Sequence, residues 1–591
     1  MSVDSITLEI IRNALTTIAK EMTLAIERTS RSPAVNECRD FATVIMDSQG
    51  QLIAQGLGAP SLMAATKHSV QAILEDYPDD FHAGDVVINN DPYRGGSHLG
   101  DTTLAMPVFH EGNLLFLIGA RAHLPDATGG GARVSGIYLD ATEIMEEGLR
   151  FPPLKLHEAG VPNKARMDWL LRNCRFKAWT IGDINAMLSA CHVGEARILS
   201  LIEKYGALAV TEAADYSLDY AERLFRAEVA SWKDGVYEGA AYMDSDGYDA
   251  RDVKVHVRLI VDGDHLTMDF SGTDKETLGF ANSGLGNSLG YIFLGLSSAL
   301  DESIPKNDGL FRVVELNLPL GSVVNPYDAA PTGVCTLHPG AEITQAVTIA
   351  LAQIIPERVG APWDTRIFFT FTGADPRDNA AYQAMSFIGL HGGPGATHGL
   401  DGWGGGSNIR GGMPYTTPEM FEFQFPEQVE SREFIQDTAG PGEWRGGCGI
   451  RTVVKAVGHS TRGNALVLGG ANPAPGLCGG LPGAPNKLSF LYVDRPDKEL
   501  PPGQPREEYL NAGEGMSVER GGGGGWGNPM SRDPELVRED VIDEYVSFEG
   551  ALRDYGVALD EETLEIDAAA TEEHRQRRRA GAFPSVPGRF R

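Results

Sequence analysis

The sequence predicts an α+β protein in which an N-terminal helix and two β-hairpins come first, a helical segment follows, and a β-rich, glycine-rich region comes last. Three observations support this prediction: an amphipathic pattern at the N-terminus, apolar runs beside turn sequences, and abundant glycine. Glycine accounts for 71 of the 591 residues, a share well above the usual ~7%. Because glycine permits tight turns and close backbone approach, this excess favours a loop-rich β architecture over a helical bundle.

The clearest predicted helix spans residues 5–29. Six apolar residues recur there at steps of three or four, the spacing that lines one face of a helix. They are Leu8, Ile11, Leu15, Ile18, Met22 and Ile26. Asp4 or Ser5 can cap the first turn, and Pro33 prevents a long C-terminal extension. We therefore expect one amphipathic helix that buries this stripe.

Two β-hairpins and several helices are predicted after this first helix. The first hairpin joins residues 41–46 to 52–55 through the turn 47–50, and the second pairs 102–109 with 114–122. Further helices are expected at 61–76, 164–173, 182–204 and 208–232.

After about residue 235 the sequence becomes β-rich. Short apolar runs such as 253–261 and 266–270 are separated by glycine and aspartate, and a helix is expected at 342–355. The glycine-rich stretches 392–412 and 521–527 contain Trp403 and Trp526, so we interpret them as loops and not as linkers.

These patterns predict three parts of the chain. They are a metal-binding α+β domain at 1–235, a β-rich domain carrying the glycine-rich motif at 236–565, and a mobile basic tail at 566–591.

Composition excludes some classes of partner. The formal net charge is −31, so nucleic acid and anionic membranes would be repelled. No apolar run approaches the ~18 residues of a membrane-spanning helix. The six cysteines are far apart and form no Cys-x-x-Cys motif, which is typical of reduced thiols. We therefore expect a cytoplasmic protein that does not act on membranes or nucleic acid.

The most polar loop of the first half, residues 89–101, lies between two predicted strands. His98 and Asp101 in this loop offer an imidazole nitrogen and a carboxylate, a pair that suits Zn²⁺, Mn²⁺ or Fe²⁺. Such spacing also occurs by chance. The alternative interpretation is a loop histidine whose nitrogens bond to the backbone.

Pairing within the second hairpin brings a third candidate ligand close. If Phe109 faces Leu114, Asp101 lies opposite Ala122, next to His123. Facing Cβ atoms in a sheet are ~5 Å apart, so one metal ion could reach side chains from both strands.

A fourth ligand could come from the start of the first hairpin. Asp40 and Glu37 are the candidates there, although a turn aspartate is the commoner role for such a residue. Three protein ligands and an open position would favour a hydrolytic site, whereas four closed ligands would favour a structural one.

Other motifs point less clearly to chemistry. Residues 244–249 resemble part of a calcium loop but are better interpreted as a solvated acidic turn. The glycine-rich run 284–290 is interpreted as a turn, and 521–525 lacks the Gly-Lys-Ser/Thr ending of a phosphate loop. Cys335, with His338 nearby, is interpreted as a structural thiol. The chain therefore shows no recognisable nucleotide site.

Several motifs together resemble hydantoinase B proteins. In chain order they occupy residues 36–41, 90–93, 95–101, 121–123, 141–144, 147–153, 269–273, 444–447, 522–529 and 555–557. The resemblance extends from about residue 5 to 560, almost the whole chain. One departure follows His123, where Leu124-Pro125-Asp126 stands in place of a second histidine found in many relatives.

The resemblance implies the B-type component of an ATP-dependent hydantoinase, lactamase or 5-oxoprolinase. It also implies a metal site, with zinc or manganese expected and iron as a further option, that matches His98, Asp101, His123 and an acidic residue of the 37–40 segment. A separate hydantoinase A-type partner would bind ATP, and the two components would form a paired heterotetramer.

The predicted activity is the opening of a small cyclic amide. The partner would use ATP to phosphorylate the amide oxygen, or bicarbonate, and a metal-activated water would then open the ring. The expected catalytic residues are His98, Asp101, His123, Asp40 and Glu37, with Arg121 and Asp126 as supporting or substrate-contacting residues. The alternatives are a component of an acetone- or acetophenone-type ketone carboxylase and a non-catalytic, metal-stapled scaffold for the ATP-binding partner.

Overall fold

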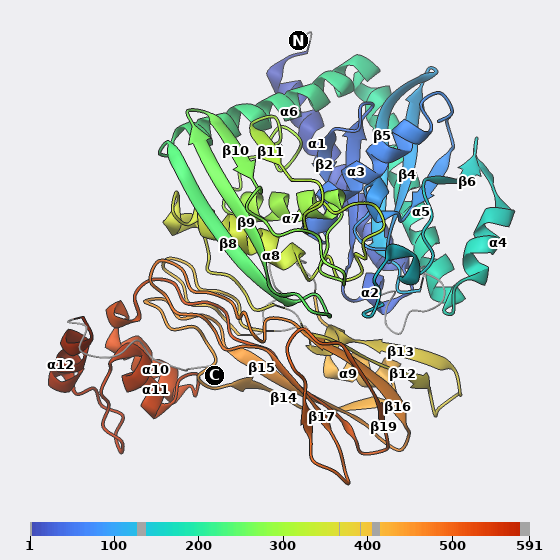
Figure 1. Ribbon diagram of the computed structural model, residues 1–591. Helices are drawn as coiled ribbons and strands as arrows, with labels where there is room; N and C mark the ends of the chain where they lie inside the picture. The colour runs from blue at the N-terminus through green and yellow to red at the C-terminus, as the bar shows by residue number, and fades with distance from the viewer. Residues whose placement is uncertain (1–2, 127–137, 366, 390–391, 405–413, 580–591) are drawn as a thin grey trace. The chain divides into compact units, whose positions relative to one another are not determined.

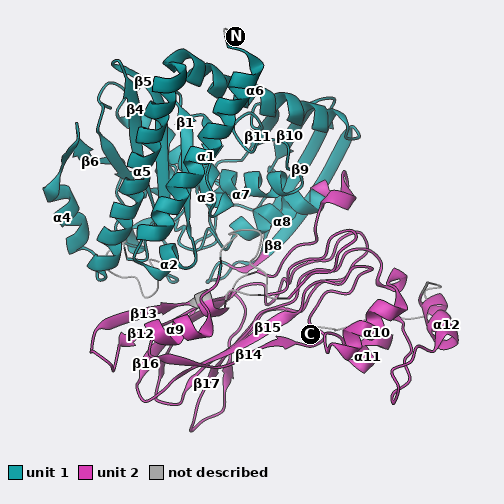
Figure 2. Cartoon of the chain, turned by 180° about the vertical axis from the view of Figure 1, so that it is seen from behind, with its two compact units in different colours: residues 1–242, 246–350, 410–414 teal, residues 243–245, 351–409, 415–591 magenta. Residues whose placement is uncertain are grey.

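The computed structural model describes residues 3–126, 138–365, 367–389, 392–404 and 414–579 (Figure 1). Two compact units make up the chain (Figure 2). Unit 1 comprises residues 1–242, 246–350 and 410–414, and unit 2 comprises 243–245, 351–409 and 415–591.

Unit 1 is built around a seven-stranded antiparallel sheet with the order β2-β1-β5-β4-β3-β6-β7. Its strands are β1 (Phe41–Asp47), β2 (Leu52–Gln55), β3 (Val86–Asn89), β4 (Asp101–His110), β5 (Asn113–His123), β6 (Leu154–Glu158) and β7 (Val161–Pro162). Both predicted hairpins are therefore confirmed, because β1 pairs with β2 and β4 with β5.

Helices cover both faces of this sheet. On one face lie α1 (Ser5–Thr29), α5 (Lys177–Tyr205) and α6 (Ala207–Ala230), and on the other lies α3 (Pro60–Asp76). The sheet side chains alternate accordingly, since Ile118 belongs to the first core and its neighbour Leu117 to the second. Because both faces are covered, the central strands β1, β4 and β5 are buried along most of their length.

The N-terminal helix has the predicted bounds. All six residues of its apolar stripe are buried, and the Asp4 carboxylate accepts the backbone N–H groups of Ile6 and Thr7 at 3.1 Å each. The helix α4 (Lys164–Arg172) also lies where it was expected, whereas α5 begins five residues before the predicted start at 182.

A second, four-stranded sheet follows, with the order β11-β10-β9-β8. Its strands are β8 (Gly235–Ser245), β9 (Arg251–Asp262), β10 (His265–Asp269) and β11 (Val314–Asn317). The helices α7 (Leu285–Ser298) and α8 (Gly340–Leu351) belong to the same part of the chain. The predicted helix at 342–355 is therefore present, with both ends displaced toward the N-terminus.

The interpretation of residues 284–290 as a turn is wrong, because this run forms the first turns of α7. Gly290 allows close packing of α7 on α3. A Cβ atom at Gly290 would lie only 2.2 Å from the carbonyl oxygen of Ser61. A glycine run can thus mark a helix contact as well as a turn.

The compact units differ from the predicted division at residue 235. Residues 246–350 belong to unit 1, because α7 packs against α3. The compositional change at 235 marks the passage from α6 to β8 and not a domain boundary.

Unit 2 contains two sheets that share one core. One sheet has the order β13-β12-β16-β19, and the other has the order β14-β15-β20-β17-β18. Their strands are β12 (Ile367–Ala374), β13 (Ala381–Met385), β14 (Glu427–Ile435), β15 (Gly449–Ala456), β16 (Thr461–Val467), β17 (Lys487–Leu491), β18 (Lys498–Glu499), β19 (Arg506–Leu510) and β20 (Gly515–Glu519). Phe369 from the first sheet and Phe490 from the second belong to the same hydrophobic cluster.

Four helices complete the described part of unit 2: α9 (Pro418–Gln424), α10 (Pro534–Ile542), α11 (Phe548–Tyr555) and α12 (Ala568–Arg579). The helix α12 forms the first half of the segment predicted as a mobile tail. Arg575 is buried there, and its guanidinium donates to the carbonyls of Tyr555 and Arg532 at 3.1 and 2.7 Å. Residues 580–591 lie outside the described chain.

The glycine-rich run 521–527 forms no helix or strand, as predicted, and it is buried. Its backbone is hydrogen-bonded to other glycine-rich segments, with Gly523 N–H donating to Gly447 O at 3.0 Å and Gly440 N–H donating to Gly523 O at 2.9 Å. Glycine is used here for close backbone packing. Of the other predicted loop, 392–412, the part from residue 405 onward lies outside the described residues.

Within the described ranges, no helix combines the length and the apolar character required to cross a bilayer.

The contact between α7 and α3 predicts that Gly290→Ala destabilises the protein. Alanine favours a helix by up to ~1 kcal/mol over glycine, but its methyl group would meet a backbone oxygen that cannot rotate away. We expect a net loss of about 1–3 kcal/mol in the free energy of unfolding, measured by urea denaturation. The control is Ser298→Ala at the exposed end of α7. Equal stability of the two variants would contradict this account of the contact.

Candidate metal centre

The register of β4 and β5 places Asp101 directly opposite His123. The prediction placed Asp101 opposite Ala122, one residue away. The difference arises from a β-bulge, because Phe109 pairs with Leu114 while Val108 pairs with Phe116. Leu115 is the extra residue, and it shifts every later pair by one position. Asp101 and His123 are therefore closer than expected.

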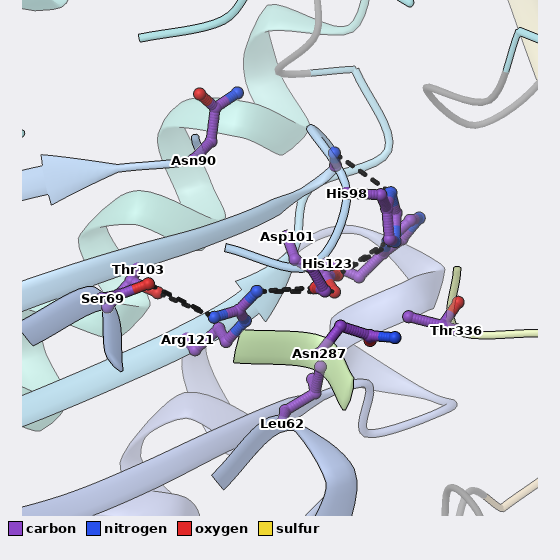
Figure 3. A network of polar contacts seen from close by, with 12 residues as sticks. Leu62, Ser69, Asn90, His98, Asp101, Thr103, Arg121, His123, Asn287 and Thr336 are labelled. Carbon is purple, nitrogen blue, oxygen red and sulfur yellow. Dashed lines mark hydrogen bonds and ion pairs between the residues drawn. The ribbon is translucent and has the colours of Figure 1, made fainter. Parts of the chain in front are cut away.

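Three candidate ligands meet at the end of this strand pair (Figure 3). The Asp101 Oδ1 atom lies 3.3 Å from His98 Nε2 and 3.2 Å from His123 Nδ1. One ligand atom from each residue lies within 4.8 Å of the others. All three side chains are buried, with residue exposures of 5% or less. The structure thus brings together His98, Asp101 and His123, as the sequence predicts.

Gly100 makes the close approach of the two imidazoles possible. A Cβ atom at this position would lie 2.8 Å from His98 Cε1 and 2.9 Å from His123 Cε1. The Gly100 N–H donates to His98 Nδ1 at 3.2 Å, and its carbonyl accepts the Leu124 N–H at 2.8 Å. The glycine therefore links the ligand loop to the end of β5 and leaves space for both rings.

A buried arginine supports the other side of Asp101. The Ser97 hydroxyl donates to Asp101 Oδ2, and Arg121 Nη2 donates to Ser97 Oγ at 2.6 Å. Arg121 Nη2 itself lies 3.8 Å from Asp101 Oδ2. The other terminal nitrogen, Nη1, faces Ser69 Oγ and Gly95 O at 3.4 Å each. Arg121 comes from β5, and it is fully buried.

Burial, neighbouring charges and hydrogen bonds shift the pKa values of the ionisable groups in this site. Burial opposes ionisation of Asp101, yet the His98 charge and hydrogen bonds from His123 and His98 hold the pKa of Asp101 well below its ordinary value. Burial also opposes protonation of His123, but the hydrogen bond to Asp101 and the charge of Asp40 raise its pKa. Burial lowers the pKa of Arg121 from its ordinary value.

The two candidates for a fourth ligand precede β1. The backbone carbonyl of Asp40 accepts the His123 N–H at 2.9 Å, which fixes Asp40 beside the end of β5. Glu37 follows the short helix α2 (Pro33–Asn36). Both residues are half-buried. Neither belongs to the three-residue cluster described above, so the choice between them stays a prediction.

Asp126 has a definite structural contact. It is buried, and its carboxylate accepts the backbone N–H of Phe176, the residue that precedes α5. Burial raises the pKa of this carboxyl group. This hydrogen bond of Asp126 thus connects the segment after β5 to the start of α5.

Sequence reasoning did not identify Ser97 or Asn287. Asn287 lies on α7, where its amide donates to Ser283 Oγ at 2.8 Å and to Cys335 O at 3.0 Å, and Figure 3 draws it with the candidate ligands. Polar residues within the apolar helix α7 were the available signal. Cys335 is buried and burial raises the pKa of its thiol well above the ordinary value, in agreement with the predicted structural thiol.

Glu147 is a buried carboxyl group to which the sequence analysis assigns no role. Its Oε1 accepts the Gly333 N–H at 2.6 Å, and its Oε2 has no hydrogen-bond partner among the described residues. Burial raises the pKa of Glu147 to about 8. The side chain therefore keeps its proton at neutral pH while it holds the segment before Cys335.

The prediction of a solvated acidic turn at 244–249 holds for Asp249, which is exposed, and is wrong for the other two aspartates. Asp244 and Asp246 are both buried. Asp246 accepts the N–H groups of Tyr248 and Ala250 at 2.9 and 3.1 Å, and Asp244 accepts the N–H of Asn472 at 2.8 Å. Backbone donors satisfy these carboxylates, so they brace loops.

Two imidazoles and a carboxylate buried at the end of an antiparallel strand pair define the chain as a candidate metalloprotein. Comparison with known families then places it more narrowly. The sequence matches the Hydantoinase B/oxoprolinase family over residues 4–529. The chain belongs to this family.

Relatives include one component each of a caprolactamase and of a putative hydantoinase, and a 5-oxoprolinase. The beta chain of the caprolactamase of Pseudomonas jessenii is 33% identical, over 97% of this chain and 99% of the relative. The B component of a putative D-/L-hydantoinase from a Pseudomonas species is 29% identical, over 97% and 98% of the two chains. The 5-oxoprolinase 1 of Arabidopsis thaliana is 26% identical over 89% of this chain, which spans 42% of that longer protein.

Solved structures share the fold. The crystal structure of the ATP-dependent caprolactamase from Pseudomonas jessenii matches with a TM-score of 0.91 and 31% identity, over 98% of this chain and 100% of that chain. Nucleotide-free acetone carboxylase matches with a TM-score of 0.88 at 19% identity, over 99% of this chain and 84% of that chain. The second likeness shows a common fold.

The buried Glu147 predicts a specific pH dependence of stability. Its pKa of about 8 in the folded state exceeds the ordinary 4.5, so between these values the folded state retains a proton that the unfolded state loses. The Glu147 contribution to stability therefore falls as pH rises from about 5 to 8. Glutamine has no proton to lose, so we expect Glu147→Gln to gain stability relative to the natural protein over this range.

Urea denaturation at several pH values between 5 and 8 measures this effect. The control is Glu143→Gln, at an exposed position four residues earlier. A stability difference between Glu147→Gln and the natural protein that does not change with pH would contradict the assignment of a neutral carboxyl group.

Proposed function

We propose that this chain is the metal-containing B-type component of an ATP-dependent cyclic amide hydrolase. The observation that carries this proposal is the buried meeting of His98, Asp101 and His123 at one point. The similarity to the beta chain of a caprolactamase over nearly the whole length supports the reaction class. The caprolactamase and hydantoinase relatives are each named as one component of a larger enzyme, which supports a partner chain.

The residues present fit a divalent metal ion. Two imidazole nitrogens and a carboxylate oxygen are ligands accepted by zinc, manganese and iron. The space between the two rings exists because position 100 is glycine, since a Cβ atom there would press on both imidazoles. In this proposal His98, Asp101 and His123 hold the ion, and Asp40 is the fourth ligand.

Asp40 is preferred over Glu37 for two reasons. Its carbonyl is hydrogen-bonded to the His123 backbone, which fixes the residue beside the cluster. Its carboxylate also raises the pKa of His123. Glu37, three residues earlier, then serves as the general base in this proposal.

An unstrained amide resists attack by water because resonance stabilises it. In the proposed reaction a hydantoinase A-type partner uses ATP to activate the ring amide, in a paired heterotetramer of two kinds of chain. When bound, the metal ion would polarise the former amide oxygen and lower the pKa of a bound water from 15.7 toward ~7.

The residues of this chain would then have two roles, to hold the ion and to accept a proton. His98, His123, Asp101 and Asp40 orient the reactants by fixing the ion, and Glu37 accepts the proton of the attacking water. As the C–O bond forms, the C–N bond of the ring breaks and the leaving nitrogen takes up a proton, which leaves an acyl phosphate. A second water then cleaves the acyl phosphate. The products are a ring-opened amino acid or N-carbamoyl acid and inorganic phosphate.

Removal of either imidazole is expected to abolish ring opening. Each of His98→Ala and His123→Ala removes a proposed ligand, and because even residues that merely support metal ligands cost 10–100-fold, we expect a loss of at least about 100-fold. The assay co-expresses the chain with its A-type partner and measures ATP-dependent opening of caprolactam, 5-oxoproline and hydantoin.

The control variant is His192→Ala, at an exposed position on α5. Full turnover in both ligand variants would show that the metal takes no part in the reaction. It would favour the alternative in which this chain is a scaffold for the ATP-binding partner. Retention of labelled bicarbonate in a new carboxylic acid would indicate carboxylation instead of hydrolysis.

The roles proposed for the two acidic residues make separate predictions. Asp40→Asn removes a ligand charge, so metal content and activity should fall together. Glu37→Gln removes only the proton acceptor, so metal content should persist while kcat falls. Metal analysis of the purified variants beside steady-state kinetics distinguishes the two, and the reverse pattern would exchange the roles of Asp40 and Glu37.

A further inference from the structure

The two carboxylate oxygens of Asp101 have different surroundings. Oδ1 faces both imidazoles, at 3.3 Å from His98 Nε2 and 3.2 Å from His123 Nδ1. Oδ2 points the other way and accepts the Ser97 hydroxyl. One oxygen of the carboxylate therefore faces the candidate metal position, and the other faces Ser97 in the interior of the sheet.

The Ser97 hydroxyl donates one hydrogen bond and accepts another. Its oxygen accepts from Arg121 Nη2 at 2.6 Å, so its single proton is directed to Asp101 Oδ2. Ser97 and Arg121 are both fully buried. Such a chain of bonds in a buried site has little freedom to rearrange.

We infer that Ser97 and Arg121 are positioning residues that restrict Asp101 to a single metal-binding oxygen. This inference rests on the metal site of the proposed function. With Oδ2 held by Ser97, only Oδ1 can approach an ion between the imidazoles. A carboxylate that bound through both oxygens would occupy a further coordination position, the one that a water or substrate oxygen needs.

The guanidinium of Arg121 adds an electrostatic effect. At its other end Nη1 faces Gly95 O and Ser69 Oγ at 3.4 Å each and Thr103 Oγ1 at 3.5 Å, so Ser69 is one of three contacts there and two remain without it. Its Nε has no hydrogen-bond partner within the described chain. A buried cation behind Asp101 draws charge away from the carboxylate, which leaves a bound ion more electron-poor and hence a stronger Lewis acid.

The test compares two serine substitutions that touch the same guanidinium. Ser97→Ala removes the hydroxyl between Arg121 and Asp101. The matched control, Ser69→Ala, removes a buried hydroxyl at the far end of Arg121 that does not contact Asp101. Each full-length variant, purified with its A-type partner and stripped of metal, is titrated with Zn²⁺ and Mn²⁺ in competition with a chromophoric chelator.

We expect Ser97→Ala to weaken metal affinity 10–100-fold, whereas Ser69→Ala keeps the affinity of the natural protein. Substitution with Co²⁺ provides a readout beyond affinity. The visible absorption of Co²⁺ weakens as the coordination number rises, so releasing Oδ2 in Ser97→Ala should lower it, and the control should not.

Arg121→Lys serves as a second variant in case Ser97→Ala fails to fold, which thermal unfolding of the metal-free proteins reveals. Lysine keeps the charge but lacks the fork that reaches both ends, so the same changes are expected. Natural affinity and an unchanged Co²⁺ spectrum in Ser97→Ala, or equal losses in both serine variants, would overturn the inference. If the natural protein binds no more metal than His98→Ala, the proposed function itself fails.

Discussion

The pairing of β4 with β5 is the constraint on which the site depends. These two strands lie at the centre of the seven-stranded sheet, with helices covering both faces. Their register places Asp101 opposite His123 at the point where the strands end. The neighbouring strand β1 runs antiparallel to β5, and its approach brings Asp40 to the His123 backbone. A rigid sheet thus positions groups from three separate stretches of chain.

A cluster of buried charges is a costly way to stabilise a fold. Moving a carboxylate and a guanidinium out of water carries a penalty of several kcal/mol per ion. Asp101 and Arg121 recover part of this penalty through Ser97 and the two imidazoles. Apolar side chains would stabilise the sheet at a lower cost. Buried ionisable groups with shifted pKa values are instead concentrated at functional sites. The arrangement is therefore better explained by chemistry than by folding.

Local patterns predicted much of unit 1 correctly. The apolar stripe of α1, its Asp4 cap and both hairpins follow from side-chain periodicity and turn chemistry, which act over a few residues. The errors occurred where distant contacts decide the structure. Residues 284–290 begin a helix whose Gly290 lies against the Ser61 backbone of α3, and the bulge at Leu115 changed the register that simple counting predicted.

The sequence by itself determined the hairpin order, the meeting of His98, Asp101 and His123, and the family, because these depend on short-range patterns and motifs. The tertiary structure decided which Asp101 oxygen faces the imidazoles, that Ser97 and Arg121 hold the other, and that Glu147 is buried as a neutral acid. Side-chain orientation and burial depend on the packing of segments that lie far apart in the chain, and spacing along the sequence does not contain that information.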